Sequence, residues 1–326
     1  MTQAFTFNNL CASVAALVAF GLAQPAALAA YPEKPVRIVV PFAPGGGTDL
    51  IARTLGAGMS AELKTPVIID NKPGAGTVIG TDAVAKSAPD GYTLVMASFA
   101  HAVNPSLQPK LPFSTEKDFA PVILVGRGPN VLTVRADSPH KTVADIIAAA
   151  KANPKKLTYA SQGNGTSAHL AGELFSNLAK VELTHVPYRG AGPAINDLLG
   201  GQVDMIFGTA AAVGTFLESG KLRAIAVTTA ERSPALKGVP PIAEVVPGYV
   251  VESWYGLYAP AGTPADVIAR LNAAAKKAAQ TENFRKRVAE EGLAITAGSP
   301  SELDAYVKAE EARWRKVVKE NNITAN

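Results

Sequence analysis

Two glycine-rich loops carry the residues of this chain that are best suited to binding chemistry. The first, 41–49, reads Pro-Phe-Ala-Pro-Gly-Gly-Gly-Thr-Asp and follows the apolar run Val36–Val40. The second, 161–167, reads Ser-Gln-Gly-Asn-Gly-Thr-Ser and follows the run Leu157–Ala160. A helical pattern follows each loop, and a helix start presents unpaired backbone N–H groups and a positive dipole end. Each loop therefore predicts a carboxylate or phosphate site, and together they suggest two lobes that hold one anion.

The first loop has an ordinary interpretation beside the functional one. It could be a tight turn in which Thr48 or Asp49 caps the following helix. Three consecutive glycines, 45–47, are more than a turn needs, because ordering each glycine costs extra backbone entropy. We therefore favour binding through main-chain amides. The loop is not a nucleotide-binding P-loop, since no Gly-Lys-Ser/Thr follows it.

The second loop has the spacing of a dinucleotide-binding fingerprint. Gly163, Gly165 and Ala168 fit the pattern G-x-G-x-x-A between a strand and a helix. That fingerprint also needs an acidic residue at the end of the next strand, where it binds the ribose. Glu182 precedes the strand 183–186 instead of ending it, so NAD is not expected. An exported enzyme that uses the loop Gly163–Ala168, a dehydrogenase or a hydrolase, is the alternative function.

Catalytic and metal-binding patterns are weak along the whole chain. Tyr159 stands two positions before Ser161, so Ser161 is not in a G-x-S-x-G nucleophile elbow. His169 could border a cleft or could pack inside the protein. The other histidines and the strand-flanking carboxylates stand singly, without a H-x-x-x-H pair or an adjacent acid pair: His101, His140, His185, Asp49, Asp70, Asp82 and Asp204. We therefore expect no enzymatic activity, no metal and no cofactor.

Two further groups leave alternatives open. Arg189, in the small-residue turn 188–193, could pair with a ligand carboxylate through two guanidinium donors, or could be a solvated surface side chain. The aromatic residues Phe42, Phe99 and Trp254-Tyr255 could line a ligand cavity. Core packing is the commoner fate of such residues.

The N-terminal segment predicts export. Residues 10–22 are largely apolar and Ala27-Leu28-Ala29 resembles a cleavage site, so we expect 1–29 to be a signal peptide that is removed in the periplasm. The first ten residues contain no Lys or Arg, and a buried helix or a membrane anchor is the alternative. Cys11 is the only cysteine. A mature chain without it would have no disulfide and no thiolate.

Size and charge narrow the possible functions. A mature chain of roughly 300 residues exceeds the usual core of one domain, so two domains are expected. The formal net charge is +4, but the basic residues are scattered and not clustered among aromatic residues. Nucleic acid is therefore not an expected partner.

Strand-like and helical segments alternate from Val36 onward, which predicts an α/β architecture with mainly parallel sheets. Helices are expected after both loops, at 77–86, from the cap Thr142, from Thr263-Pro264 with Asp266, and from the capping box of Ser299-Pro300 with Glu302. The apolar stripes are Ile51-Leu55-Met59-Leu63, Leu170-Leu174-Leu178 and Ile268-Leu271-Ala275-Ala278. Strands are expected at 36–40, 66–70, 93–97, 121–125, 157–160, 183–186, 203–207, 222–227 and 254–260, with only helices afterwards.

A set of short segments resembles the Bug family, the extracytoplasmic receptors of tripartite tricarboxylate transporters. The resemblance covers nearly the whole mature chain. The segments that carry it are Tyr31–Phe42, Pro44–Asp49, Asn71–Gly76, Ala88–Leu94, Asp118–Val122, Gly165–Leu170, Val186–Gly190 and Trp254–Leu257. The family often has Lys at the position of Arg189 and varies at Gly47, so the shape of the pocket could differ here.

The resemblance implies a type II periplasmic-binding-protein fold, a Venus flytrap of two α/β lobes joined by two crossing strands. Lobe 1 would comprise 30–125 and 253–326, and lobe 2 would comprise 126–252. It implies a periplasmic receptor, expected to be a monomer, that captures a small organic carboxylate and delivers it to a membrane permease. A receptor that serves a sensor is the alternative.

Family members bind carboxylates through main-chain amides, hydroxyls and bridging waters. Carried over to matching positions, this implicates in lobe 1 the residues Phe42, Ala43, Gly46, Gly47, Asp49 and Ser98. In lobe 2 it implicates Ser161, Gly165, Thr166, Ser167, His169, Ala191 and Asp204.

Overall fold

The computed structural model describes residues 31–108, 110–289 and 292–324. The chain divides after Glu33, and Lys34–Asn326 form one compact unit, to which everything below refers. The expected signal peptide, 1–29, lies outside the described residues. Within the described ranges, no helix has the length and apolar character needed to cross a membrane.

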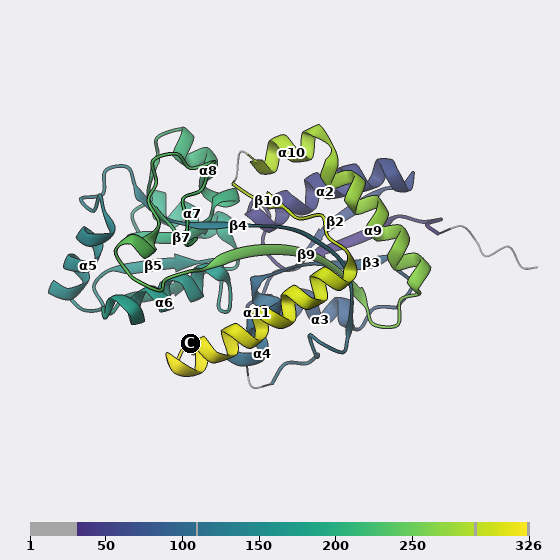
Figure 1. Ribbon diagram of the computed structural model, residues 1–326, viewed down its shortest axis with the longest axis horizontal. Coiled ribbons are helices and arrows are strands. Elements are labelled where there is room, and N and C mark those ends of the chain that lie inside the picture. The colour runs from purple at the N-terminus through teal and green to yellow at the C-terminus, as the bar shows by residue number, and fades with distance from the viewer. Residues whose placement is uncertain (1–30, 109, 290–291, 325–326) are drawn as a thin grey trace, which may run out of the picture. The chain divides into compact units, whose positions relative to one another are not determined.

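The sheet has the strand order β2-β1-β3-β9-β4-β7-β5-β6, and a set of three parallel strands lies at each end of this order (Figure 1). In the first set, β1 (Val36–Val40) lies between β2 (Val67–Asn71) and β3 (Thr93–Ser98). In the second, β5 (Thr158–Ser161) lies between β7 (Met205–Thr209) and β6 (Thr184–Pro187). Within each set, the carboxyl ends of the strands lie along one edge of the sheet. We call these sets the first and the second strand triplet.

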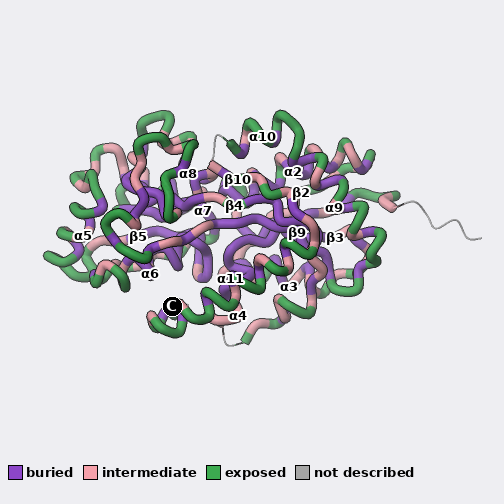
Figure 2. Tube along the Cα trace, viewed as in Figure 1, coloured by how far each residue is buried: buried purple, intermediate pink, exposed green. Residues whose placement is uncertain are grey.

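Two long antiparallel strands, β4 (Phe119–Arg135) and β9 (Glu252–Pro260), join the triplets. Up to Pro129, β4 pairs with β9, and from Asn130 it pairs with β7 and β8 (Leu222–Val227). Figure 2 shows that both long strands are buried over most of their length. The expectation of mainly parallel pairing is therefore correct within the triplets and wrong at their junction. The predicted strand 121–125 is only the first part of β4.

The helices that cover the sheet follow the predicted apolar stripes in most places. In α2 (Gly47–Leu63) the whole stripe from Ile51 to Leu63 is buried. The helices α5 (Val143–Ala152) and α11 (Pro300–Glu320) begin with complete capping boxes at Thr142 and Ser299, as expected. Further helices are α3 (Val78–Ala85), α9 (Ala265–Gln280) and α10 (Glu282–Ala289).

Some of the sequence predictions are wrong in detail. Leu178 of α6 (Ser167–Ala179) is 39% exposed, so its apolar stripe ends at Leu174. In α9 the buried residue of the first turn is Val267, not Ile268. A short strand, β10 (Ala294–Ile295), pairs with β4 where only helix was expected. Three unpredicted helices are α4 (Phe99–Leu107), α7 (Ala191–Leu199) and α8 (Ala210–Glu218).

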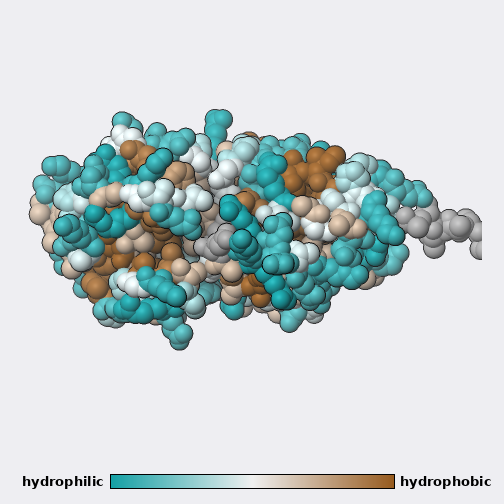
Figure 3. All heavy atoms as spheres, turned by 90° about the horizontal axis from the view of Figure 1, so that it is seen from above, coloured by the Kyte–Doolittle hydropathy of each residue, from teal (hydrophilic) through white to brown (hydrophobic). Residues whose placement is uncertain are grey.

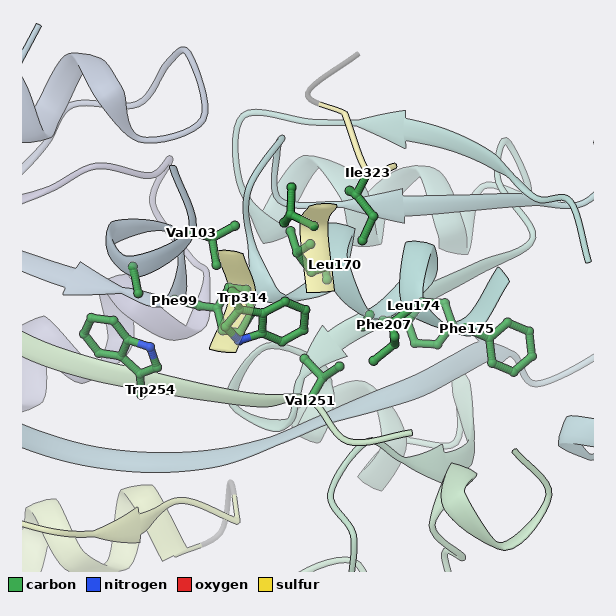
Figure 4. Close-up of a cluster of buried hydrophobic side chains, with 14 of the residues drawn as sticks. Phe99, Val103, Leu170, Leu174, Phe175, Phe207, Val251, Trp254, Trp314 and Ile323 are labelled. Atoms are coloured by element: carbon green, nitrogen blue, oxygen red, sulfur yellow. The ribbon is translucent and has the colours of Figure 1, made fainter. Parts of the chain in front are cut away.

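A single cluster of buried side chains connects residues from both strand triplets and α11 (Figure 4). Trp314 of α11 meets Phe99 of α4 edge to face, with 4.8 Å between the ring centroids. On the face seen in Figure 3, hydrophobic residues form separate groups among hydrophilic ones. The large exposed hydrophobic side chains are Ile68, Ile79, Leu178 and Val245.

Candidate functional site

A small cavity lies where the carboxyl edges of the two strand triplets meet. Both glycine-rich loops contribute to its wall. Among the described residues, its lining consists of Phe42, Gly46, Gly47, Thr48, Ser98, Phe99, Gln162, Thr166, Ser167, Ala191, Thr209 and Ser253. The two loops, which are separated by more than one hundred residues of sequence, therefore belong to one site.

Five helices begin at this cavity. The lining contains the N-cap or first residue of α2, α4, α6, α7 and α8, and these follow β1, β3, β5, β6 and β7. A helix N-terminus carries a partial positive charge of about half an elementary charge and several unpaired N–H groups. Where parallel strands end in this way, the edge of the sheet is a natural place for an anionic ligand.

Four of these five helices lack a side-chain cap, as α3 and α9 do elsewhere in the chain. Gly46, Ser98, Gly190 and Thr209, the N-caps of α2, α4, α7 and α8, form no side-chain capping hydrogen bond. Only Thr166, at the start of α6, accepts a bond from a backbone N–H of its own helix. The helices that start away from the cavity at Thr142 and Ser299 are fully capped. The first-turn N–H groups at the cavity are thus left for another acceptor.

The lining contains no charged side chain among the described residues. It does contain buried polar atoms that have no hydrogen-bond partner there, both amide atoms of Gln162 and Oγ1 of Thr209. A buried polar atom without a partner costs about 1–3 kcal/mol. The site is therefore suited to a ligand that brings both negative charge and hydrogen-bonding atoms.

Asp49 was expected to contact the ligand, but its carboxylate is occupied within the first loop. It accepts hydrogen bonds from Gly45 N at 3.0 Å, Arg53 Nε at 2.9 Å and Asn71 Nδ2 at 2.9 Å. Burial alone would raise the pKa of Asp49, but the bonds from Arg53, Gly45 and Asn71 outweigh burial and lower it. Asp49 does not line the cavity. Its role in the structure is to hold the loop in shape.

The second loop is held from inside by two histidines. Gly165 N donates to His169 Nδ1 at 3.2 Å, and Ser161 Oγ lies 2.6 Å from His185 Nε2. The His169 and His185 rings stack with centroids 4.4 Å apart. Burial lowers the pKa of His169 to about 4, and burial together with His169 lowers the pKa of His185 to about 3. Both rings are therefore neutral near pH 7. The bond from Gly165 requires this of His169, because its Nδ1 must accept.

Contacts between the two sides of the cavity are close. Ala43 N donates to Arg189 O at 3.1 Å, next to Gly190. A Cβ atom on Gly46 would lie 3.2 Å from Ala191 Cβ, and one on Gly76 would lie 2.5 Å from Asn164 O. Small residues are therefore needed where the two sides meet. Gly46, Gly76 and Ala191 meet this requirement.

Asp204 is the clearest correction among the expected site residues. Its Oδ2 accepts from Thr158 N at 2.7 Å and from Thr158 Oγ1 at 2.9 Å. Thr158 begins β5, whereas the cavity lies at the carboxyl ends of the strands. Asp204 therefore ties two strands together at the opposite edge. Arg189 lines a separate outer hollow with Lys110 and not the cavity.

The structure thus brings together seven of the residues expected to bind ligand: Phe42, Gly46, Gly47, Ser98, Thr166, Ser167 and Ala191. Ala43, Asp49, Ser161, Gly165 and His169 lie behind the cavity wall as loop supports. Sequence analysis did not predict four of the lining residues, Thr48, Gln162, Thr209 and Ser253. For Phe99 it left open whether the side chain lines the cavity or packs in the core. The position of Gln162 inside the second loop was a usable signal, whereas nothing marked Ser253.

Comparison with known proteins agrees with this geometry. The protein-family model described as tripartite tricarboxylate transporter family receptor matches residues 51–323 of this chain. The chain is 38% identical to protein BugT of Bordetella pertussis over 92% of this chain and 93% of that one. It is 40% identical to a UPF0065 protein from the tcbD-tcbE intergenic region of Pseudomonas sp. strain P51, over 92% of this chain and 90% of that one.

Solved structures show the same fold. The periplasmic binding protein BugD, 34% identical, superposes with a TM-score of 0.87 over 90% of this chain and 99% of that one. Rpa4515 of R. palustris, solved with adipate, is 38% identical with a TM-score of 0.86, over 90% and 99%. MatC from Rhodopseudomonas palustris, solved with bound malate, is 36% identical with a TM-score of 0.84, over 88% and 100%.

Proposed function

Because the chain belongs to the family of tripartite tricarboxylate transporter receptors, we propose that it is a periplasmic receptor that captures a small organic carboxylate for a membrane permease. The family consists of solute-binding receptors and not of enzymes, so we do not propose a reaction at the Gly163–Ala168 loop. The substrate class, the permease and the periplasmic location of this chain are the parts that experiments must test.

The convergence of five helix N-termini on one cavity is the observation that carries this proposal. Four of these helices have no side-chain cap, so their amide groups can donate to a bound carboxylate. The dipoles replace the salt bridge that a charged lining residue would otherwise supply. Such a site binds an anion without a fixed counter-ion.

The same observation limits the substrate class. No Asp or Glu lines the cavity among the described residues, so the ammonium group of an amino acid would be buried beside positive dipole ends without a carboxylate partner. Adipate and malate, the ligands of two related structures, carry no amine. We therefore propose a mono- or dicarboxylate without an amino group.

A thermal-shift screen followed by calorimetric titration tests the ligand class. The panel contains mono-, di- and tricarboxylates, aromatic acids and amino acids, and a ligand that binds only the folded state raises the melting temperature. Malate and aspartate form a matched pair that differs in one group, and malate should bind at least about tenfold more tightly. A panel in which no carboxylate binds would overturn the proposed function. Equal affinity for the pair would overturn the exclusion of amines.

The partner can be tested in cells. Deletion of the gene that encodes this chain should reduce uptake of the identified carboxylate, and expression of the exported protein should restore uptake. Uptake that is unchanged while transcription in response to the carboxylate is lost would indicate the sensor alternative. Cell fractionation tests the expected periplasmic location.

A further inference from the structure

The point at which β4 changes partners is occupied by a buried asparagine. Pro129 is the last β4 residue that pairs with β9, opposite Glu252, and Asn130 is the first that pairs with β7, opposite Thr209. Asn130 is 0% exposed. It therefore lies at the junction of the two strand triplets, beside a strand that ends at the cavity.

The side chain of Asn130 makes two hydrogen bonds that fix its orientation. Nδ2 donates to Phe207 O at 2.6 Å and to Ser167 Oγ at 3.1 Å. A backbone carbonyl can only accept, so the amide nitrogen, and not the amide oxygen, must face Phe207. The second hydrogen of the same nitrogen is then the one directed at Ser167.

This contact determines what the Ser167 hydroxyl can do. A hydroxyl has one proton and two acceptor positions, and Asn130 occupies one acceptor position. The Ser167 proton is left for another acceptor. Ser167 lines the cavity at the first position of α6, so that acceptor can be a ligand carboxylate.

The main chain of Asn130 is tied to the segment that returns to β9. Asn130 N donates to Thr228 Oγ1 at 2.8 Å, and Thr228 N donates to Asn130 O at 2.9 Å. Thr228 Oγ1 also reaches Val251 O at 2.6 Å, and Val251 N donates to Thr228 O at 2.8 Å. Asn130, Thr228 and Val251 thus join the two connections between the triplets.

We propose that Asn130 is a positioning residue for ligand binding: it orients the Ser167 hydroxyl as a donor to the ligand carboxylate from the junction of the two strand triplets. The proposal rests on the proposed function, because it requires a carboxylate in the cavity. It adds a residue that does not line the cavity and that links a ligand-contacting hydroxyl to both crossing segments.

A double-mutant cycle tests the link. Calorimetry would measure the affinity for the tightest carboxylate of the panel in the wild type, Asn130→Ala, Ser167→Ala and the double variant. Each single substitution should weaken binding about tenfold or more, and the double variant should bind within about threefold of Ser167→Ala alone, because both changes remove the same donor. Independent, multiplicative losses would overturn the proposal.

The isosteric variant Asn130→Asp gives a second readout that a purely structural role would not change. An ionised carboxylate accepts from Ser167 and turns its proton away from the ligand, so binding should be at least about tenfold weaker at pH 7.5. The same change in a Ser167→Ala background should cause little further loss of affinity, because the hydroxyl that it turns away is already absent.

The outcomes separate the two proposals. Failure of every carboxylate to bind the wild type would overturn the proposed function and this inference with it. Binding by the wild type, combined with independent losses in the cycle or with a full further loss from Asn130→Asp in the Ser167→Ala background, would overturn the role of Asn130 alone. Ser60→Ala is a matched control, since the Ser60 hydroxyl donates to Gly56 O in α2 and does not line the cavity.

Discussion

Gly47 shows how little room the cavity wall leaves for a side chain. A Cβ atom at this position would lie 2.7 Å from Thr209 Oγ1, 2.9 Å from Ala211 Cβ and 2.9 Å from the Tyr255 hydroxyl. These neighbours belong to the end of β7, to α8 and to β9, and not to the first loop. The glycine is therefore required by the opposite wall of the site and not by the backbone conformation of its own helix.

Substitution of this glycine should weaken binding without unfolding the protein. Gly47→Ala is expected to lower the affinity for the ligand at least about tenfold, because the wall must move by several tenths of an ångström. Gly214→Ala is the matched control, since it lies in helix α8 with nothing within 4 Å of its Cβ position. Titration calorimetry measures both, and equal affinities would contradict this explanation of the glycine.

Buried histidines make the stability of the protein dependent on pH. His101 packs against Phe119 and Tyr258, with ring centroids 5.1 Å and 4.8 Å away, and burial lowers its pKa from 6.5 to about 4. Between these two values the unfolded chain binds a proton that the folded chain does not. Stability therefore falls as the pH is lowered from about 6.5 towards 4. His169 and His185 add to the effect, since their pKa values are lowered in the same direction.

Removal of one such histidine should reduce this acid sensitivity. His101→Phe is expected to remove about 2 kcal/mol of the stability lost between pH 7.5 and pH 5. Urea unfolding at the two pH values measures the difference. His140→Gln should keep the full loss, because His140 is only partly buried, at the end of a loop before α5. A pH dependence that is the same in His101→Phe and the wild type would refute the assignment.

At the residue scale, sequence analysis found the loops but not the whole lining. Gly46, Gly47 and Ser167 were predictable because glycines and hydroxyls cluster before a helical pattern. The expectation that Asp49 and Asp204 contact the ligand was wrong. A carboxylate near a strand end can bind the backbone as well as a ligand, and only the fold shows which it does. Ser253 was missed because it lines the cavity from a long strand that carries no loop motif.

At the scale of elements, four of the five helices that begin at the cavity lack a side-chain cap, a feature that α3 and α9 share. Thr142 and Ser299 complete capping boxes, whereas Ser98 and Thr209 at the cavity make no capping bond. A capping residue is worth about 1 kcal/mol. The protein therefore forgoes local helix stability where a ligand is proposed to act as the acceptor.

A carboxylate introduced at one of these open caps should imitate the ligand. Ser98 has the extended backbone conformation of an N-cap, so Ser98→Asp can accept from the first turn of α4. We expect the melting temperature to rise by about 2–4 °C and ligand binding to be lost. Scanning calorimetry with and without ligand measures both effects.

The capped helices provide the control for this experiment. Thr142→Ala should lower the melting temperature by about the same amount and leave the affinity for ligand unchanged, because α5 does not line the cavity. A Ser98→Asp variant that still binds ligand with wild-type affinity would show that α4 does not serve the anion.

Short length and internal helix breakers explain which helices sequence analysis missed. The helices found at 143–152 and 300–320 have N-cap side chains and long apolar patterns. Those missed, α4, α7 and α8, are nine residues each. Pro105 lies inside α4 and Gly192-Pro193 inside α7, residues that usually indicate a turn. Their short length and these internal residues remove the usual signs of a helix.

At the scale of the whole molecule, the alternation of strands and helices was enough to predict the α/β class. The junction was harder to predict, because the run Gly-Arg-Gly-Pro-Asn at 126–130 interrupts the apolar pattern of β4, although the strand continues through it and changes partners there. The two expected lobes and their boundaries at 125/126 and 252/253 remain a prediction. The change of pairing at Asn130 lies within five residues of the first boundary.

Closure of two lobes around the ligand has a measurable consequence. If the ligand contacts both strand triplets, it stabilises the arrangement in which Ala43 and Arg189 are hydrogen-bonded over a more open one. Small-angle X-ray scattering should then show a smaller radius of gyration at saturating ligand than without it. An unchanged radius at saturation would contradict the clamshell mechanism and would leave the carboxylate site itself unaffected.

The uncharged lining of the cavity also determines how the affinity for ligand depends on the salt concentration of the medium. A periplasmic receptor would experience changes in the ionic strength of its medium. Mobile ions screen exposed charges beyond a Debye length of about 10 Å at 0.1 M salt, but they screen buried groups far less. Because amide dipoles and hydroxyls inside the cavity replace surface cations, the affinity for a carboxylate should change little between dilute and concentrated salt.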